Sequence, residues 1–374
     1  MKIKDYIYLF IIISLYLLIL VVFKREVFTN KFDPTVVDRY LCSQDIPYEP
    51  PCKRLFLSDS DLYLGSGYLY VKGSDPTTYD FQVPPLLKYL FGYSILLFNN
   101  PYFVQIGFGV VFLYIIYLLG LKTFKKSEIS LLTCLFVLVD PLFINLATTI
   151  LLDLGQGVFL LSYFLSMFFY KRNSVVQGVL LGLLFTSKFW GGSIFFILII
   201  LAYLLYRREF NLKKYLIHLI VAFIVFCLIY TKTFVNNGGK FNIFFFELKL
   251  LNFYINHNVS SIFGASLFLF LTGYVKTWWG NREIIKSSPW SILWVIGLII
   301  SSTMAIKEIL HKRISLKLLI GSMPFLYLVY LGVQAPFPRY FILILPFIYL
   351  VMSDFIYYFF KFNIQGLNKK IKLT

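Results

Sequence analysis

The sequence predicts an all-α, polytopic membrane protein with about ten transmembrane helices and two large loops on one side of the membrane. Composition is the first observation: 59% of the 374 residues are hydrophobic and only 14% are charged, whereas about one quarter of the residues in soluble domains are charged. Apolar runs are the second observation, because about 17 to 25 residues cross a hydrocarbon core roughly 30 Å thick. We therefore expect residues 1–374 to form a single membrane domain.

The apolar runs mark the predicted transmembrane helices. No small-residue cleavage site follows the first run, so we expect a retained helix and not a cleaved signal peptide. The runs fall at 5–23, 102–121, 129–148, 154–170, 175–188, 192–206, 214–230, 290–305, 315–332 and 340–358.

The basic residues predict the orientation of these helices. The net charge is +17, and the basic clusters lie at alternate helix ends, at 2–4, 122–126, 171–172, 207–214, 307–313 and 361–372. Because cytoplasmic loops carry an excess of Lys and Arg, these ends and both termini are expected in the cytoplasm. The net positive charge is therefore attributed to the orientation of the helices in the membrane, with a contribution from contact with anionic lipid. No nucleic-acid partner is expected.

The first predicted outer loop, residues 24–101, is acidic. It carries nine of the eighteen Asp and Glu residues of the chain, and its aromatic residues and prolines favour an ordered cap on the membrane. Cys42 and Cys52 lie in this loop on the oxidising side, so a disulfide between them is expected, although spacing alone does not demonstrate it. Cys134 and Cys227 fall within predicted spans and are interpreted as small apolar fillers.

The second predicted outer loop is residues 231–289. Its apolar stretch 265–275 is short for a crossing, and an eleventh span would place the basic cluster 307–313 and the basic C-terminal tail outside. We therefore expect a helix lying at the membrane interface there. The two outer loops would then face each other.

Ionisable side chains near the membrane indicate a functional site, because each costs a few kcal/mol at that depth. Those expected at the outer helix ends are Asp59, Asp61, Asp153, Lys188, His257 and Arg339. In an extended segment Asp59 and Asp61 would share a face, where they would hold a divalent metal such as Mg²⁺ or Mn²⁺ or supply a general base. The alternative interpretation of this pair is a solvated turn.

The other candidates also have two interpretations. Asp153 is either a helix N-terminal acid or a residue of the cleft, and both roles are compatible. Lys188 and Arg339 either extend toward the interface or hold a phosphate, which would suit an isoprenoid carrier. His257 is the one histidine expected on the outer side, where it would position an acceptor or a metal.

In order along the chain, several segments resemble the protein O-mannosyltransferase family and its lipid A aminoarabinose transferase relatives, which are GT-C type membrane glycosyltransferases. The first outer loop supplies SDSDLYLGSGYLYVKG and YDFQVPPLLKYLFG. Further matching segments are LVDPLFINLATTILLDLGQG, GVLLGLLFTSKFWGG, FYINHN, SSPWSILW and PRYFILILPF. In this resemblance Asp59 matches the catalytic Asp of the family and Lys188 its lysine. Ser60, Val83 and Thr149 depart from the family pattern.

The resemblance implies a glycosyltransferase that moves a sugar, a hexose such as mannose, from a polyprenyl or dolichyl phosphate to a protein, glycan or lipid acceptor. Transfer would occur with inversion on the extracytoplasmic face. Asp59 would act as the base, while Lys188 and Arg339 would hold the donor phosphate. Asp61, Asp153 and His257 would position the acceptor or a metal. The membrane would be that of a prokaryotic cell, with the endoplasmic reticulum as the alternative.

Two other function classes are compatible with the sequence. A transporter or flippase for a lipid-linked sugar would use the same cations without needing Asp59, but transporters often show internal repeats, and the chain shows none. A structural subunit of a membrane complex would need the outer loops for binding and not for turnover.

Overall fold

The computed structural model describes most of the chain. The described residues are 1–374 without 45, 47, 48, 50, 51, 171, 172, 257–262, 278–282 and 372–374, and for 362–371 the backbone alone is described. His257 therefore lies outside the described residues.

The described residues are almost all helical. The helices are α1 (Ile3–Phe23), α2 (Glu26–Thr29), α3 (Thr35–Leu41), α4 (Asp59–Lys72), α5 (Leu86–Phe98), α6 (Tyr102–Phe124), α7 (Ser127–Val139), α8 (Pro141–Ala147), α9 (Asp153–Phe169), α10 (Ser174–Ser187), α11 (Gly191–Tyr206), α12 (Leu212–Ile229), α13 (Thr231–Asn236), α14 (Ile243–Asn256), α15 (Ala265–Thr272), α16 (Ile292–Leu310), α17 (Leu316–Leu331), the 3-10 helix η1 (Pro338–Leu343) and α18 (Leu345–Ile371). The strands β1 (Tyr274–Lys276) and β2 (Ile284–Lys286) pair antiparallel, which the sequence patterns did not predict.

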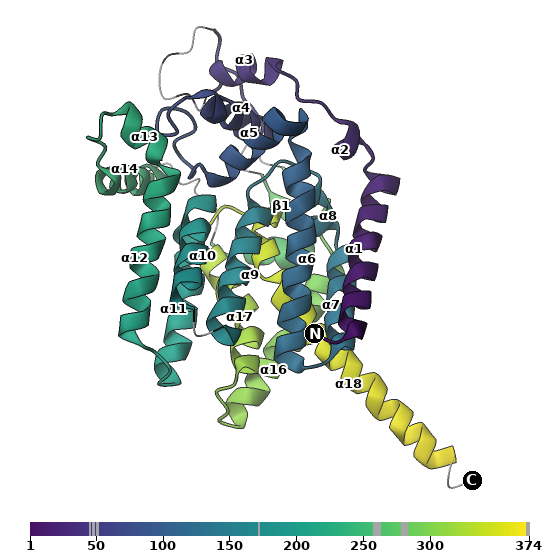
Figure 1. The fold of residues 1–374 in the computed structure, drawn as a ribbon. Coiled ribbons are helices and arrows are strands. Elements are labelled where there is room, and N and C mark those ends of the chain that lie inside the picture. The colour runs from purple at the N-terminus through teal and green to yellow at the C-terminus, as the bar shows by residue number, and fades with distance from the viewer. Residues whose placement is uncertain are drawn as a thin grey trace.

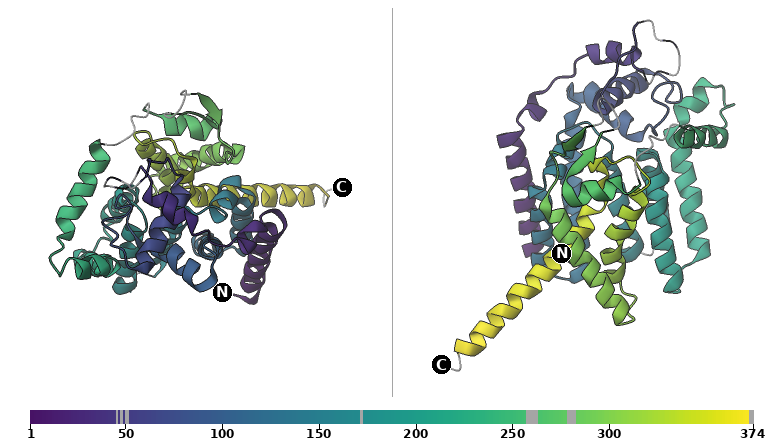
Figure 2. Two further views of the ribbon diagram at one scale, coloured as in Figure 1. Left: turned by 90° about the horizontal axis from the view of Figure 1, so that it is seen from above. Right: turned by 180° about the vertical axis from the view of Figure 1, so that it is seen from behind.

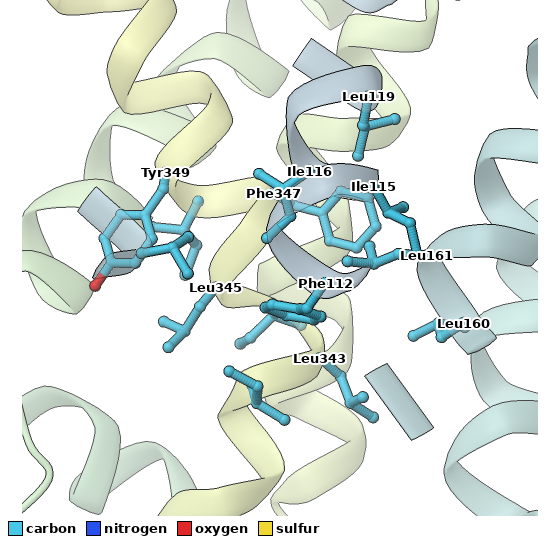
Figure 3. Close-up of a cluster of buried hydrophobic side chains, with 14 of the residues drawn as sticks. Phe112, Ile115, Ile116, Leu119, Leu160, Leu161, Leu343, Leu345, Phe347 and Tyr349 are labelled. Carbon is cyan, nitrogen blue, oxygen red and sulfur yellow. The ribbon is translucent and has the colours of Figure 1, made fainter. Parts of the chain in front are cut away.

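The long helices run side by side as a bundle, with α2 to α5 across one end (Figure 1). Both termini lie toward the other end, and the last part of α18 projects away from the bundle in both side views (Figures 1 and 2). The main apolar core joins α6, α9, η1 and α18 (Figure 3), where Phe112, Leu161, Leu343 and Phe347 are buried. Dense side-chain packing of this kind holds helices together in lipid.

Every apolar run that predicted a span contains helix in the structure, but the count of ten is not confirmed. In the described part of the chain, α1, α6, α12 and α16 are long and apolar enough to cross a membrane. A fifth span would combine α7 and α8, which meet at an angle of 71°. Five further apolar helices in the described residues are shorter, namely α5, α9, α10, α11 and α17.

The bend between α7 and α8 has a local cause. Asp140 precedes Pro141, and a residue before proline is disfavoured in the helical conformation; its backbone is extended, with φ −73° and ψ 121°. Pro141 then occupies the first turn of α8, where a missing N–H is tolerated. The Asp140 carboxylate accepts hydrogen bonds from the backbone N–H groups of Leu142 (2.8 Å) and Phe143 (3.3 Å). One Asp-Pro pair thus ends one helix and begins the next.

The two regions expected as outer loops contain short helices, and α13 and α14 of the second region contact the connection between α4 and α5 in the first. The Thr233 hydroxyl of α13 donates to Asp75 at 2.7 Å, and the Tyr254 hydroxyl of α14 donates to the carbonyl of Gln82 at 2.8 Å. The expected interfacial helix is α15, which at eight residues spans about 12 Å. The first of these regions, with α2 to α5, positions the candidate site.

Within the first region, a disulfide and two glycines fix the helices. Cys42 and Cys52 form the disulfide, with their Cα atoms 5.5 Å apart, so the end of α3 is tied to the segment before α4. Helices α4 and α5 cross at Gly67 and Gly92, where a Cβ on Gly67 would lie 2.4 Å from the carbonyl oxygen of Lys88. Only glycine allows this approach of the two backbones.

Candidate active site

Asp59 stands at the first turn of α4, which crosses the end of the bundle. Ser58 begins the helix, because its hydroxyl accepts a hydrogen bond from the backbone N–H of Asp61 at 3.2 Å. The Asp59 side chain is 38% exposed, and its carboxylate forms an ion pair with Arg339 of η1. The first turn of α4 therefore presents Asp59 to a segment far away in the sequence.

Arg339 links Asp59 to a second carboxylate. The Arg339 Nε atom lies 3.7 Å from the Asp153 carboxylate, at the start of α9. Asp153 in turn pairs with Lys188, the residue that follows α10. Four of the six predicted site residues thus form one group, Asp59, Arg339, Asp153 and Lys188, which we call the charged cluster.

The charged cluster is closed on one side and accessible on the other. The Asp153 side chain is only 3% exposed, and those of Lys188 and Arg339 are 14% and 16% exposed. Asp59 is the most exposed member. Its carboxylate is therefore the member best placed to meet a molecule arriving from outside.

Aromatic rings hold the two cations in place. The Lys188 ammonium lies 4.4 Å from the centre of the Tyr340 ring, and the Arg339 guanidinium lies 4.4 Å from that of Phe337. Tyr63, one turn after Asp59 on α4, is buried. Burial, together with the negative charge of Asp59, raises the pKa of Tyr63, so its hydroxyl remains protonated.

Asp61 does not join the charged cluster. The expectation of an extended segment is wrong, since Asp59 and Asp61 both lie in the first turn of α4, and helix residues two apart do not face each other. Asp61 lies 4.0 Å from Arg39, whereas Asp59 contacts Arg339.

A metal site at this pair is not supported by the arrangement of oxygen ligands. The two carboxylates do not converge, and among the described residues there is no group of three or more His, Cys, Asp or Glu side chains able to hold a metal ion. A divalent cation normally takes several oxygen ligands. We therefore assign no step to a metal.

A buried ion pair behind α4 was not predicted as part of the site. The Lys88 ammonium donates to the carbonyls of Asp80 and Val83, each at 2.7 Å, and lies 3.1 Å from the Asp80 carboxylate. Burial lowers the pKa of Lys88, and Asp80 opposes this effect. Both residues belong to the segment YDFQVPPLLK. The Lys in this apolar stretch, eight residues after an Asp, is the sequence feature that could have predicted the ion pair.

A second missed acid is Glu247 of α14. The Trp190 indole N–H donates to its carboxylate at 2.9 Å, and Trp190 lies two residues after Lys188. Burial raises the pKa of Glu247, while the Trp190 hydrogen bond opposes this effect. No sequence motif pointed to this contact, because α14 and the segment after α10 meet only in the folded chain.

Comparison with solved structures defines the class of fold. The first match is the structure of ArnT from Cupriavidus metallidurans bound to undecaprenyl phosphate, with a TM-score of 0.59 and 14% identity, and the second is its apo state, with a TM-score of 0.53 and 14% identity. Each covers 86% of this chain, and this chain covers 58% and 57% of theirs. The chain therefore has an ArnT-like fold and spans a little over half the length of ArnT.

The sequence match is narrower. Residues 82–233 match the family described as dolichyl-phosphate-mannose-protein mannosyltransferase, a segment that includes Asp153 and Lys188. No curated protein sequence matches the chain. The family match and the ArnT-like fold together confirm the resemblance to GT-C type, PMT-like proteins.

Proposed function

We propose that this protein is a glycosyltransferase that takes a sugar from a polyprenyl phosphate carrier and passes it to an acceptor on the extracytoplasmic face. The charged cluster is the observation that carries the proposal, because it combines two phosphate-binding cations with an accessible carboxylate. The ArnT structure bound to undecaprenyl phosphate supports a donor of this chemical class.

In the proposed reaction, an acceptor hydroxyl attacks the anomeric carbon of the sugar. The bond from that carbon to the phosphate oxygen breaks, and the electron pair leaves with the phosphate. Lys188 and Arg339 stabilise the negative charge that develops there. Asp59 accepts the proton of the acceptor hydroxyl, and attack opposite the leaving phosphate inverts the anomeric centre.

The ion pair between Asp59 and Arg339 gives the donor a role in activating the base. While the pair is intact, the Asp59 carboxylate is held by the Arg339 guanidinium and does not face an acceptor hydroxyl freely. A donor phosphate competes with Asp59 for the guanidinium. Donor binding therefore releases Asp59 toward the acceptor.

Mannose as the sugar, and a protein as the acceptor, are the finer parts of the proposal, supported by the family description alone. Asp61 and His257 remain proposed acceptor-positioning residues. Asp61→Asn and His257→Gln test this role through the KM for the acceptor.

The first experiment uses purified protein in nanodiscs with a panel of polyprenyl phosphate sugars and acceptors, with and without Mg²⁺ or Mn²⁺. Free polyprenyl phosphate is the product measured. Asp59→Asn should reduce turnover about 100- to 10,000-fold, the usual contribution of a general base. Asp38→Asn is the matched control, since Asp38 is an exposed acid of α3 in the same region, and it should retain activity.

An Asp59→Asn protein with wild-type turnover would exclude the proposed base. Donor binding without turnover in the wild type, unchanged by Asp59→Asn over the whole acceptor panel, would instead support a carrier of lipid-linked sugar.

A further inference from the structure

A cavity lies at the end of the bundle opposite the charged cluster. It has a volume of about 520 Å³ and is formed by the last turns of α11 and α16, the connection 311–315 and the first turns of α17. Figure 1 shows these helix ends on the same side of the bundle as both termini and away from α3 and α4. Its volume is within the range of about 300 to 1,000 Å³ typical of small-molecule sites.

The lining of the cavity is divided between apolar and basic residues. Ile199, Leu318 and Leu319 supply apolar walls, whereas Lys312 and Arg313 lie in the connection between α16 and α17. Both basic side chains are exposed. The backbone holds them in place, because the N–H of Lys312 donates to Ile309 at 2.8 Å and that of Arg313 to Glu308 at 2.9 Å.

Several neighbouring charged residues have partners of their own. Arg207 pairs with Glu209 at 2.9 Å and donates to the carbonyl of Ile314 at 2.8 Å. The carboxylate of Glu308 accepts a hydrogen bond from the Ser315 hydroxyl.

Lys317, farther along this end, pairs with Asp354 at 3.6 Å. Within the described part of the chain, neither Lys312 nor Arg313 has an ion-pair partner. These two residues therefore leave an uncompensated positive charge at the mouth of an apolar cavity.

We propose that this cavity binds an anionic phospholipid from the adjacent leaflet. The headgroup phosphate pairs with Lys312 and Arg313, and an acyl chain lies along Ile199 and Leu318. Charge and position favour an anionic lipid as the occupant. Basic pockets between transmembrane helices are suited to anionic headgroups, whereas a zwitterionic lipid brings no net negative charge. The site is separate from the charged cluster and does not depend on the proposed transferase activity.

The test is native mass spectrometry of the delipidated full-length protein titrated with phosphatidylglycerol or phosphatidylcholine. The wild type should bind phosphatidylglycerol more tightly. The double variant Lys312→Gln/Arg313→Gln should weaken that binding about 10- to 30-fold, since each cation near a membrane surface contributes about a factor of five. Its affinity for phosphatidylcholine should not change.

Two matched variants accompany it. Lys125→Gln/Lys126→Gln removes the same charge from an exposed connection at the same end, and Lys125 shares the left-handed backbone of Lys312, with φ of 56° against 53°. Lys312→Arg/Arg313→Lys preserves the charge. Both should bind phosphatidylglycerol as the wild type does.

An equal loss of affinity for phosphatidylglycerol in the Lys125→Gln/Lys126→Gln variant would show that general surface charge causes the effect, and it would contradict the proposed site. Unchanged binding in Lys312→Gln/Arg313→Gln would also overturn it. Undecaprenyl phosphate is titrated in parallel, and a charge-dependent effect seen with it but not with phosphatidylglycerol would assign the cavity to the carrier lipid and contradict the proposal.

Discussion

Arg339 contacts the carboxylates of Asp59 and Asp153, and Asp153 also pairs with Lys188. The sequence singled out these residues one by one, because ionisable groups near lipid are costly. It could not show that the cations are already paired with the acids. In the proposed reaction this pairing matters, because a donor phosphate must exchange partners with Asp59.

The buried pair of Asp80 and Lys88 gives a prediction about stability. Asp80→Asn should lower the free energy of unfolding by about 3 to 5 kcal/mol, because it leaves the fully buried Lys88 ammonium without its counter-charge. Chemical unfolding in detergent measures this. Asp38→Asn, at an exposed position, should change stability little, and an equally small effect for Asp80→Asn would show that Lys88 is neutral in the fold.

Among the elements, α4 and α5 form the support beneath Asp59. They cross at two glycines with their backbones in contact, and the disulfide of Cys42 and Cys52 ties the preceding segment to α3. The position of both cysteines in the first outer loop predicted the disulfide. The crossing could not be predicted, because a glycine in an apolar helix does not indicate which other helix packs against it.

Gly67→Ala tests this crossing. The new methyl group would lie 2.4 Å from the Lys88 carbonyl oxygen, so we expect a loss of about 1 to 3 kcal/mol in stability. Gly107→Ala on α6 is the control, since nothing lies within 4 Å of its Cβ position, and it should be neutral or stabilising by about 0.5 to 1 kcal/mol. Thermal unfolding of both variants tests this prediction, and equal melting temperatures would contradict the close crossing of the two helices.

The contact of Glu247 with Trp190 predicts a pH dependence. The pKa of Glu247 is raised in the fold, so the folded state binds the proton more tightly than the unfolded state. This contribution is complete below the unfolded pKa and is lost as the pH rises through the folded pKa.

The stability of the wild type relative to Glu247→Gln should therefore fall as the pH is raised from about 4, the unfolded pKa of a glutamate, to alkaline pH. Thermal unfolding of the two proteins across this range is the measurement. A difference that rises with pH would show the pKa to be lowered instead.

In the whole molecule, Asp140 connects three parts of the bundle. One carboxylate oxygen accepts from the start of α8, while the other accepts from the Trp294 indole of α16 at 2.7 Å and from the Tyr349 hydroxyl of α18. Sequence resemblance included Asp140 in the segment LVDPLF. Its partners, Trp294 and Tyr349, show that it holds α16 and α18 to the start of α8.

Asp140→Asn should therefore destabilise the protein without altering the site chemistry. An amide has one accepting oxygen, so either the start of α8 or the Trp294 and Tyr349 donors would face an N–H group. We expect a loss of about 2 to 4 kcal/mol, measured by unfolding. Glu128→Gln, which breaks an exposed pair with Lys4, should change stability by less than about 1 kcal/mol.

The sequence by itself determined that the protein is helical and membrane-embedded, that the acids concentrate before α6, and that Asp59, Asp153, Lys188 and Arg339 are the residues to examine. Hydrophobic run length and the penalty for charge in lipid are local properties, so they can be deduced along the chain. The number of membrane crossings cannot be deduced in this way, because several apolar helices are short and the pair α7 and α8 is bent at Asp140.

Only the tertiary structure decided that Asp59 and Asp61 separate, that Arg339 joins Asp59 to Asp153, and that a basic cavity lies at the opposite end. The separation of Asp59 and Asp61 follows from helix geometry, because two residues that are two positions apart in a helix point to different sides. The others depend on contacts between segments distant in the sequence, and such contacts are set by how the whole bundle packs.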